Sequence, residues 1–127
     1  MILTFSKEKF KRKILLGKKI HTIREDKTNR WFKGRVAQLW LGNPRNTRAK
    51  AKPHFFQEVT IVSVQEVIIK SFERMNDSYV TVDGRRLDLQ ETCDLAWNDG
   101  FENLVEFWLW FNADFTGKII HWTDKKY

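Results

Sequence analysis

The sequence has little of what small secreted or membrane proteins depend on. Cys93 is the only cysteine among 127 residues, so no disulfide can form within the chain and a secreted disulfide scaffold is excluded. No apolar run approaches the ~18 residues that a membrane span needs. Residues 1–7 lack the basic segment and apolar stretch of a signal peptide. We therefore expect a cytoplasmic protein with no membrane partner.

Familiar catalytic and cofactor motifs are also missing. His21, His54 and His121 lie far apart, and none stands in His-Glu-x-x-His spacing, so the sequence predicts no metal site. It contains no P-loop, no dinucleotide-binding glycine motif and no Gly-x-Ser-x-Gly. Cys93 falls in a predicted helix, where a buried thiol is a commoner finding than a nucleophile. No metal or organic cofactor is expected.

What the chain does have is apolar and aromatic material for one core. Apolar residues make up 42% of the sequence and aromatic residues 14%, with six Trp and ten Phe. A buried aromatic side chain contributes a large apolar area, so most of these rings should lie inside. The length and composition together predict a single domain over residues 1–127.

Positive charge is concentrated in the first part of the chain. Residues 1–52 hold sixteen Lys and Arg against three acidic residues, a balance of +13. Residues 53–127 hold seven against thirteen, a balance of −6, and the two parts give the net charge of +7. This asymmetry favours a polyanionic partner such as RNA on the N-terminal half, and the alternative is a solvated surface that maintains solubility.

The hydrophobic pattern predicts an α+β fold. The first helix is expected to bury Phe10, Ile14 and Leu15. The last helix is expected to bury Leu104, Val105, Trp108 and Phe111. The order of short strands and helices allows the strands to close a small barrel. The expected elements are a strand over 2–5, a helix capped by Ser6 and ended by Gly17, a β-prone segment over 18–24, a strand over 35–41, one bent strand or two over 55–72, a hairpin around Asp83-Gly84, a helix capped by Asp88 and Glu91 that ends near Trp97, a helix over 101–112 and a strand over 118–122.

A long basic loop separates the strands in the middle of the chain. Residues 42–54 include Arg45, Arg48, Lys50 and Lys52 and no acidic residue. Loops of this length in small domains are either mobile or functional. The loop is therefore predicted to be either a clamp for phosphates or a disordered tip.

A second basic cluster, residues 17–24, carries the most specific chemistry. In an extended segment Thr22 and Arg24 point to one side and His21 to the other. Lys18 and Arg24 would lower the pKa of a lysine between them, as would burial, and such a lysine is a possible base toward Thr22. Arg24 is suited to bind a phosphate or a carbonyl oxygen. The alternative is that these basic residues lie at the start of a strand and that their charges are simply solvated.

The spacing Gly17-x-Lys19-x-x-Thr22-x-Arg24 resembles the signature of ASCH domains, a group within the PUA-like superfamily. The resemblance covers most of the chain, and its further segments are Arg30–Val36, the Asn98–Phe101 turn, the aromatic stretch Phe107–Phe111 and the strand Ile119–Trp122. It implies a small β-barrel of mostly antiparallel strands covered by two or three helices.

The resemblance also implies an activity. Small bacterial ASCH proteins are metal-independent amidohydrolases of N4-acetylcytidine that use a Lys, a Thr and a Glu, whereas other members are ribonucleases or bind RNA. Lys19 and Thr22 match the first two catalytic positions, and Asp99 falls near the third with a shorter side chain than Glu. Asp99 would then orient Lys19 or relay a proton.

Three hypotheses arise from the sequence. The first is a module that binds RNA or a modified nucleoside, with Trp31, Phe32 or Trp40 as stacking surface. The second is a hydrolase with Lys19, Thr22 and Asp99 as its catalytic residues, and the third is a protein-interaction domain. The residues expected to contact the ligand are Lys18, His21, Arg24, Arg30, Trp31, Arg45, Arg48, Lys50 and Lys52.

Overall fold

The computed structural model describes residues 1–127 except Thr47 and Ala49. The elements within the described residues are β1 (Ile2–Phe5), α1 (Glu8–Leu15), β2 (His21–Arg24), β3 (Val36–Leu41), β4 (His54–Thr60), β5 (Ser63–Lys70), the 3-10 helix η1 (Met75–Asp77), β6 (Tyr79–Val82), β7 (Arg85–Arg86), α2 (Leu89–Asn98), α3 (Leu104–Trp110) and β8 (Phe115–His121). This order confirms the predicted α+β class. In the described part of the chain, no helix is long and apolar enough to cross a membrane.

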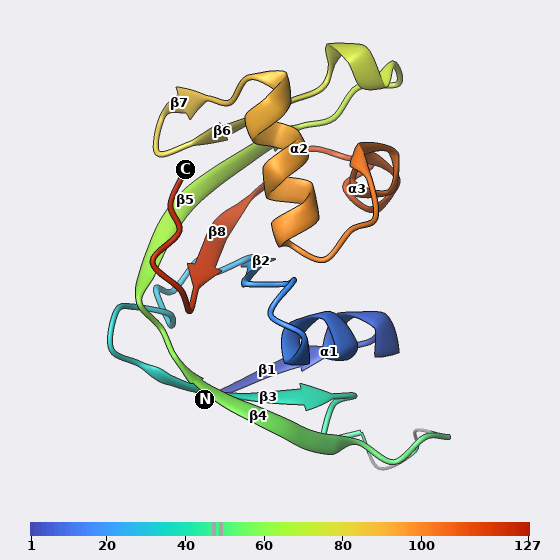
Figure 1. Ribbon diagram of the computed structural model, residues 1–127, viewed down its shortest axis with the longest axis vertical. Helices are drawn as coiled ribbons and strands as arrows, with labels where there is room; N and C mark the ends of the chain where they lie inside the picture. Colours follow the sequence, from blue (N-terminus) through green and yellow to red (C-terminus); the bar gives the residue numbers. More distant parts are fainter. Residues whose placement is uncertain (47, 49) are drawn as a thin grey trace.

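The strands form two sheets. One has the order β1-β3-β4 and the other β2-β8-β5-β6-β7. Within the described residues, β1 and β3 pair in parallel and the remaining strand pairs are antiparallel, in agreement with the expectation of mostly antiparallel strands. Among the described residues the two sheets are not joined into the single closed barrel that we expected. They form a curved wall, and the three helices lie on the same side of it (Figure 1).

The two sheets are separate because the strand that leads from one to the other is interrupted. The sequence left open whether residues 55–72 form one bent strand or two, and the structure has two, β4 and β5, separated by Ile61 and Val62. The Ile61 amide donates to the carbonyl of Arg35 and the Val62 amide to that of His121, both at 2.8 Å. These two bonds fix the chain where it leaves one sheet and enters the other.

Helix α1 ends as predicted but begins later. Its N-cap residue is Lys7, which makes no capping side-chain bond, so the assignment of Ser6 as the cap was wrong. Gly17 adopts the predicted left-handed conformation at φ +74°. Leu15 is exposed, because the face centred on Phe10 and Ile14 turns away from it.

The predicted turn and cap in the second sheet are confirmed. Asp83 and Gly84 both have positive φ, +48° and +80°, as a type I′ turn requires. The Asp88 side chain accepts a bond from the Glu91 amide, and the Glu91 side chain accepts one from the Asp88 amide. This reciprocal pair starts α2 where the sequence placed it.

Helix α3 is shorter than expected, and the face that it buries differs from the predicted one. It begins after Asn103, whose side chain accepts a hydrogen bond from the Glu106 amide. Val105 is exposed, whereas Phe107 is fully buried. The prediction that Val105 lies inside is therefore wrong, because the buried face is centred on Phe107, Trp108 and Phe111.

An aromatic cluster holds this turn against α1. The Phe101 ring is fully buried and lies edge-on to the rings of Phe10, Phe107 and Trp110, at centroid distances of 5.7, 5.6 and 5.8 Å. Such pairs contribute about 0.5–1.5 kcal/mol each beyond the burial of area. They fix the position of Asp99 and Gly100, the two residues before Phe101.

Candidate functional site

A cleft of about 320 Å³ lies where α1, β1 and β2 meet the end of α2 and α3. Its volume is within the range of small-molecule sites, about 300–1,000 Å³. Aromatic rings supply much of its wall, and its polar lining consists of Thr4, Ser6, Lys19, Thr22, Arg24 and Asp99. The structure therefore brings together Lys19, Thr22, Arg24 and Asp99, which the sequence singled out.

Lys19 is held in the wall by both neighbouring helices. Its amide donates to the carbonyl of Lys13 in α1, and the amide of the next residue, Ile20, donates to that of Asn98 in α2. Its ammonium donates to the backbone carbonyl of Asp99 and to the Asp99 carboxylate, with Nζ 3.2 Å from Oδ1. Only 3% of Lys19 is exposed.

Burial gives this lysine an unusual acidity. Loss of hydration lowers the pKa of Lys19 to about 8, although the negative charge of Asp99 opposes the shift. The Nζ atom also lies 5.6 Å from the centre of the Phe5 ring and 5.1 Å from that of Phe10, and these rings favour the charged form. At neutral pH a part of the Lys19 population is therefore a neutral amine.

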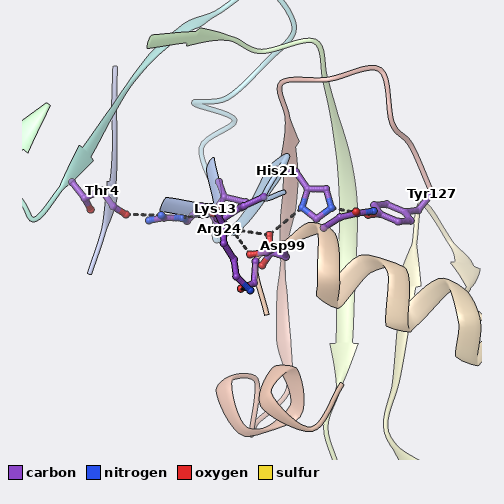
Figure 2. Close-up of polar contacts among 10 residues, drawn as sticks. Thr4, Lys13, His21, Arg24, Asp99 and Tyr127 are labelled. Carbon is purple, nitrogen blue, oxygen red and sulfur yellow. Dashed lines mark hydrogen bonds and ion pairs between the residues drawn. The ribbon is translucent and has the colours of Figure 1, made fainter. Parts of the chain in front are cut away.

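Asp99 is also held by a chain of hydrogen bonds that runs through His21 to Tyr127. Its Oδ1 lies 3.0 Å from Nδ1 of His21, and Nε2 of His21 lies 2.7 Å from the hydroxyl of Tyr127. Because a carboxylate only accepts, His21 carries its proton on Nδ1, and the Tyr127 hydroxyl donates to Nε2. The Asn98 amide in turn donates to Tyr127 at 2.9 Å. Figure 2 shows Asp99, His21 and Tyr127 in sequence along this path.

His21 therefore has a different role from the predicted one. It is fully buried and does not line the cleft, so it does not contact a ligand there as the sequence analysis expected. Burial lowers its pKa, which keeps the imidazole neutral. Its contact with Asp99 makes it a positioning residue.

Thr22 and Arg24 lie on the same side of β2, as the alternation predicted. The Arg24 Nε donates to the Thr22 hydroxyl at 3.2 Å, and another guanidinium nitrogen donates to the carbonyl of Thr4 (Figure 2). The guanidinium carbon lies 4.9 Å from the centre of the Phe5 ring. Because Thr22 accepts from Arg24, its own hydroxyl proton is available to a base or a ligand.

Lys13 supports the site, and sequence reasoning missed it. Its ammonium donates to the carbonyl of Gly100 at 3.0 Å and pairs with Glu102 at 2.6 Å. A lysine in an amphipathic helix is ordinarily solvated, but Lys13 is buried against the turn after α2. It therefore anchors the backbone on which Asp99 lies.

The stacking residue is also different from those predicted. Trp31 belongs to the core and does not line the cleft, so the expectation that it stacks on a base there is wrong. Phe32 is exposed but does not line the cleft, and Trp40 packs against Phe55 with ring centres 6.1 Å apart. Trp110 is 48% exposed and lines the cleft, so it offers the aromatic surface.

The remaining basic residues lie outside the cleft. Lys18, Arg48, Lys50 and Lys52 are exposed, and Arg30 and Arg45 line a second hollow next to it. The basic loop 42–54 includes Thr47 and Ala49, which lie outside the described residues. Within the described residues, no group of three His, Cys, Asp or Glu side chains is arranged to hold a metal ion.

The fold and the site define a small α+β protein with a buried lysine and aspartate in the wall of a cleft. Comparison of the chain with protein-family models, with curated proteins and with solved structures found no match. Any function assigned to the chain therefore depends on the residues of the cleft.

Proposed function

We propose that the cleft binds the base of an RNA-derived nucleoside and that the chain is an ASCH protein of the PUA-like superfamily. The observation that carries the proposal is the convergence of Lys19, Thr22 and Arg24 with Asp99, 75 or more residues further along the chain, in one cleft. The first three belong to the motif that resembles the ASCH signature. Asp99 reaches Lys19 in spite of being shorter than Glu.

The chemistry of the lining suits a nucleobase. Lys19 and Arg24 donate hydrogen bonds, Asp99 accepts them, and the Thr22 hydroxyl can do either. This combination matches the mixed donors and acceptors on the edge of a pyrimidine. Trp110 offers a face on which an unstacked base can lie, as single-stranded RNA recognition commonly requires.

A second candidate function is hydrolysis of an amide on the base, as in N4-acetylcytidine. The observation in its favour is the buried Lys19, whose pKa of about 8 suits a general base. Neutral Lys19 would take the proton of the Thr22 hydroxyl, and the Thr22 oxygen would attack the acetyl carbon. The C–N bond then breaks, the leaving amine takes the proton from Lys19, and water releases acetate from Thr22. Asp99 would hold the Lys19 ammonium between these two transfers.

The experiment combines binding and turnover on the purified protein. Cytidine and N4-acetylcytidine are titrated calorimetrically, and loss of the acetyl group is followed by mass spectrometry. Lys19→Ala is the test variant, and Lys33→Ala, which changes an exposed lysine outside the cleft, is the control. Binding without turnover supports the first function, and turnover that needs Lys19 supports the second. If neither compound binds at millimolar concentration, the proposal is wrong.

A further inference from the structure

A second hollow adjoins the cleft at Thr4 in β1. It has a volume of about 460 Å³, and Thr4 belongs to the lining of both. Two arginines enter it from different segments, Arg30 from the stretch after β2 and Arg45 from the loop after β3, together with Asn43 and Ile2. We call this the arginine hollow.

The backbone at both arginines is held in place. The Arg30 amide donates to Oδ1 of Asp26 at 2.8 Å, and its carbonyl accepts from the Arg35 guanidinium at 2.8 Å. The Arg45 amide donates to the side chain of Asn43 at 2.9 Å. The two guanidinium groups therefore project from fixed positions, although the arginines themselves are exposed.

The charges in the arginine hollow are not neutralised from within. No acidic residue belongs to its lining. In the part of the chain that the structure describes, neither Arg30 nor Arg45 forms an ion pair with a carboxylate. Arginine binds phosphate through two parallel N–H donors, so two unpaired guanidiniums in one hollow favour a phosphate ligand.

We infer that the arginine hollow binds a phosphate group of the ligand whose base lies in the cleft. This inference rests on the proposed function and sharpens it, because it makes the ligand a nucleotide and not a free nucleoside. Because Thr4 lines both the cleft and the arginine hollow, the sugar would lie near Thr4, between base and phosphate. The phosphate belongs either to a mononucleotide or to a short single strand of RNA, and both present the same chemistry to the two arginines.

The test compares ligands that differ only in phosphate. Affinities for cytidine, its 5′- and 3′-monophosphates and a cytidine trinucleotide are measured calorimetrically at low and moderate salt. We expect a phosphate-bearing ligand to bind about tenfold more tightly than cytidine. The gain should shrink with salt, because each neutralised phosphate on a single strand contributes a log–log slope of about −0.7. A gain with a monophosphate identifies a mononucleotide site, whereas a gain with the trinucleotide alone identifies RNA.

Three variants test whether Arg30 and Arg45 cause the gain in affinity. Arg30→Gln and Arg45→Gln should each remove most of the gain and leave cytidine affinity unchanged. Arg74→Gln removes an equal charge at η1, in an exposed position with only a loose contact to Asp77 at 3.8 Å, and should retain the gain. Equal affinities for cytidine and all its phosphates, or a gain that survives in the Arg30→Gln/Arg45→Gln double variant, would overturn the inference while the cleft proposal stands. Absence of binding by every ligand, cytidine included, would overturn both.

Discussion

The Nζ atom of Lys19 lies 3.2 Å from Oδ1 of Asp99, and at most 5% of either side chain is exposed. A buried charge is costly unless it is paired, and this contact supplies the pairing. The pair does not restore the ordinary acidity of lysine, because burial has the larger effect and lowers the pKa of Lys19 to about 8. Proton transfer by Lys19 near neutral pH is therefore chemically reasonable.

If the cleft is hydrolytic, its rate should depend on pH through Lys19. The neutral amine is the active form, so kcat/KM should rise as pH increases through about 8 and level off above it. Lys19→Arg, which stays charged throughout this range, should lose about 10²–10⁴-fold in rate. The measurement is kcat/KM for N4-acetylcytidine between pH 6 and 9.5. A rate that does not change between pH 7 and 9 would contradict the role of Lys19 as base.

Gly100 should be required for the position of Lys19. A Cβ at this residue would lie 2.9 Å from Cδ1 of Phe10 and 3.0 Å from Cδ of Lys19, and its φ is +98°. We expect Gly100→Ala to lower the free energy of unfolding by more than the ~1–3 kcal/mol of backbone strain alone and to abolish ligand binding.

Gly34→Ala is the matched control for Gly100→Ala. Gly34 has a similar φ of +90°, but a Cβ there would meet no atom within 4 Å. Gly34→Ala should lower the free energy of unfolding, measured in urea, by the backbone strain alone. It should retain ligand binding. Equal losses of binding in both variants would mean that general destabilisation, and not displacement of Lys19, is the cause.

Trp110 is expected to contribute to ligand binding in addition to its packing on Phe101 in the aromatic cluster. Removal of a stacking aromatic costs about 1–3 kcal/mol per base in single-stranded nucleic-acid binding. Trp110→Ala should therefore weaken nucleoside binding about tenfold or more, as measured by calorimetry. Phe32→Ala is the control, because Phe32 is 52% exposed, a similar fraction, but does not line the cleft. If the two variants bind equally, the stacking role is wrong.

Tyr127→Phe should destabilise the protein through groups that it leaves unpaired. The hydroxyl donates to His21 and accepts from Asn98, and a buried polar group without a partner costs about 1–3 kcal/mol. The urea midpoint should fall, and the pH–rate profile should shift because His21 loses the hydroxyl that holds its Nδ1 proton toward Asp99. Tyr79→Phe, in a ring that packs on the Arg86 guanidinium, should leave the pH–rate profile unchanged. An unshifted profile in Tyr127→Phe would limit Tyr127 to a structural role.

The features that sequence reasoning predicted correctly depend on neighbours in the chain. The Asp83-Gly84 turn and the pair of Asp88 and Glu91 are set by residues one and three positions apart. The contacts that it missed join distant residues: His21 with Tyr127, and Lys13 with Gly100. Periodicity alone cannot show that a lysine on the polar side of a helix meets a buried turn 87 residues later.

The same limit applies to the sheets and to the aromatic residues. The alternation over 55–72 predicts strand, but only pairing with β3 and β8 decides that β4 and β5 join different sheets. Trp31 and Trp110 have the same side chain, and their burial differs because of what packs over each. Asp99 was placed in the site through the family resemblance, since its own neighbours along the chain carry no such information.

The long separation between the two halves of the cleft has a consequence for biosynthesis. Lys19 is made early and Asp99 much later, so a growing chain holds a hydrated lysine with an ordinary pKa of about 10.4 until the second half emerges. Closure of such distant contacts is a slow step in folding. The lowered pKa of Lys19 therefore develops only after Asp99 and the turn around it have been made and have packed over the lysine.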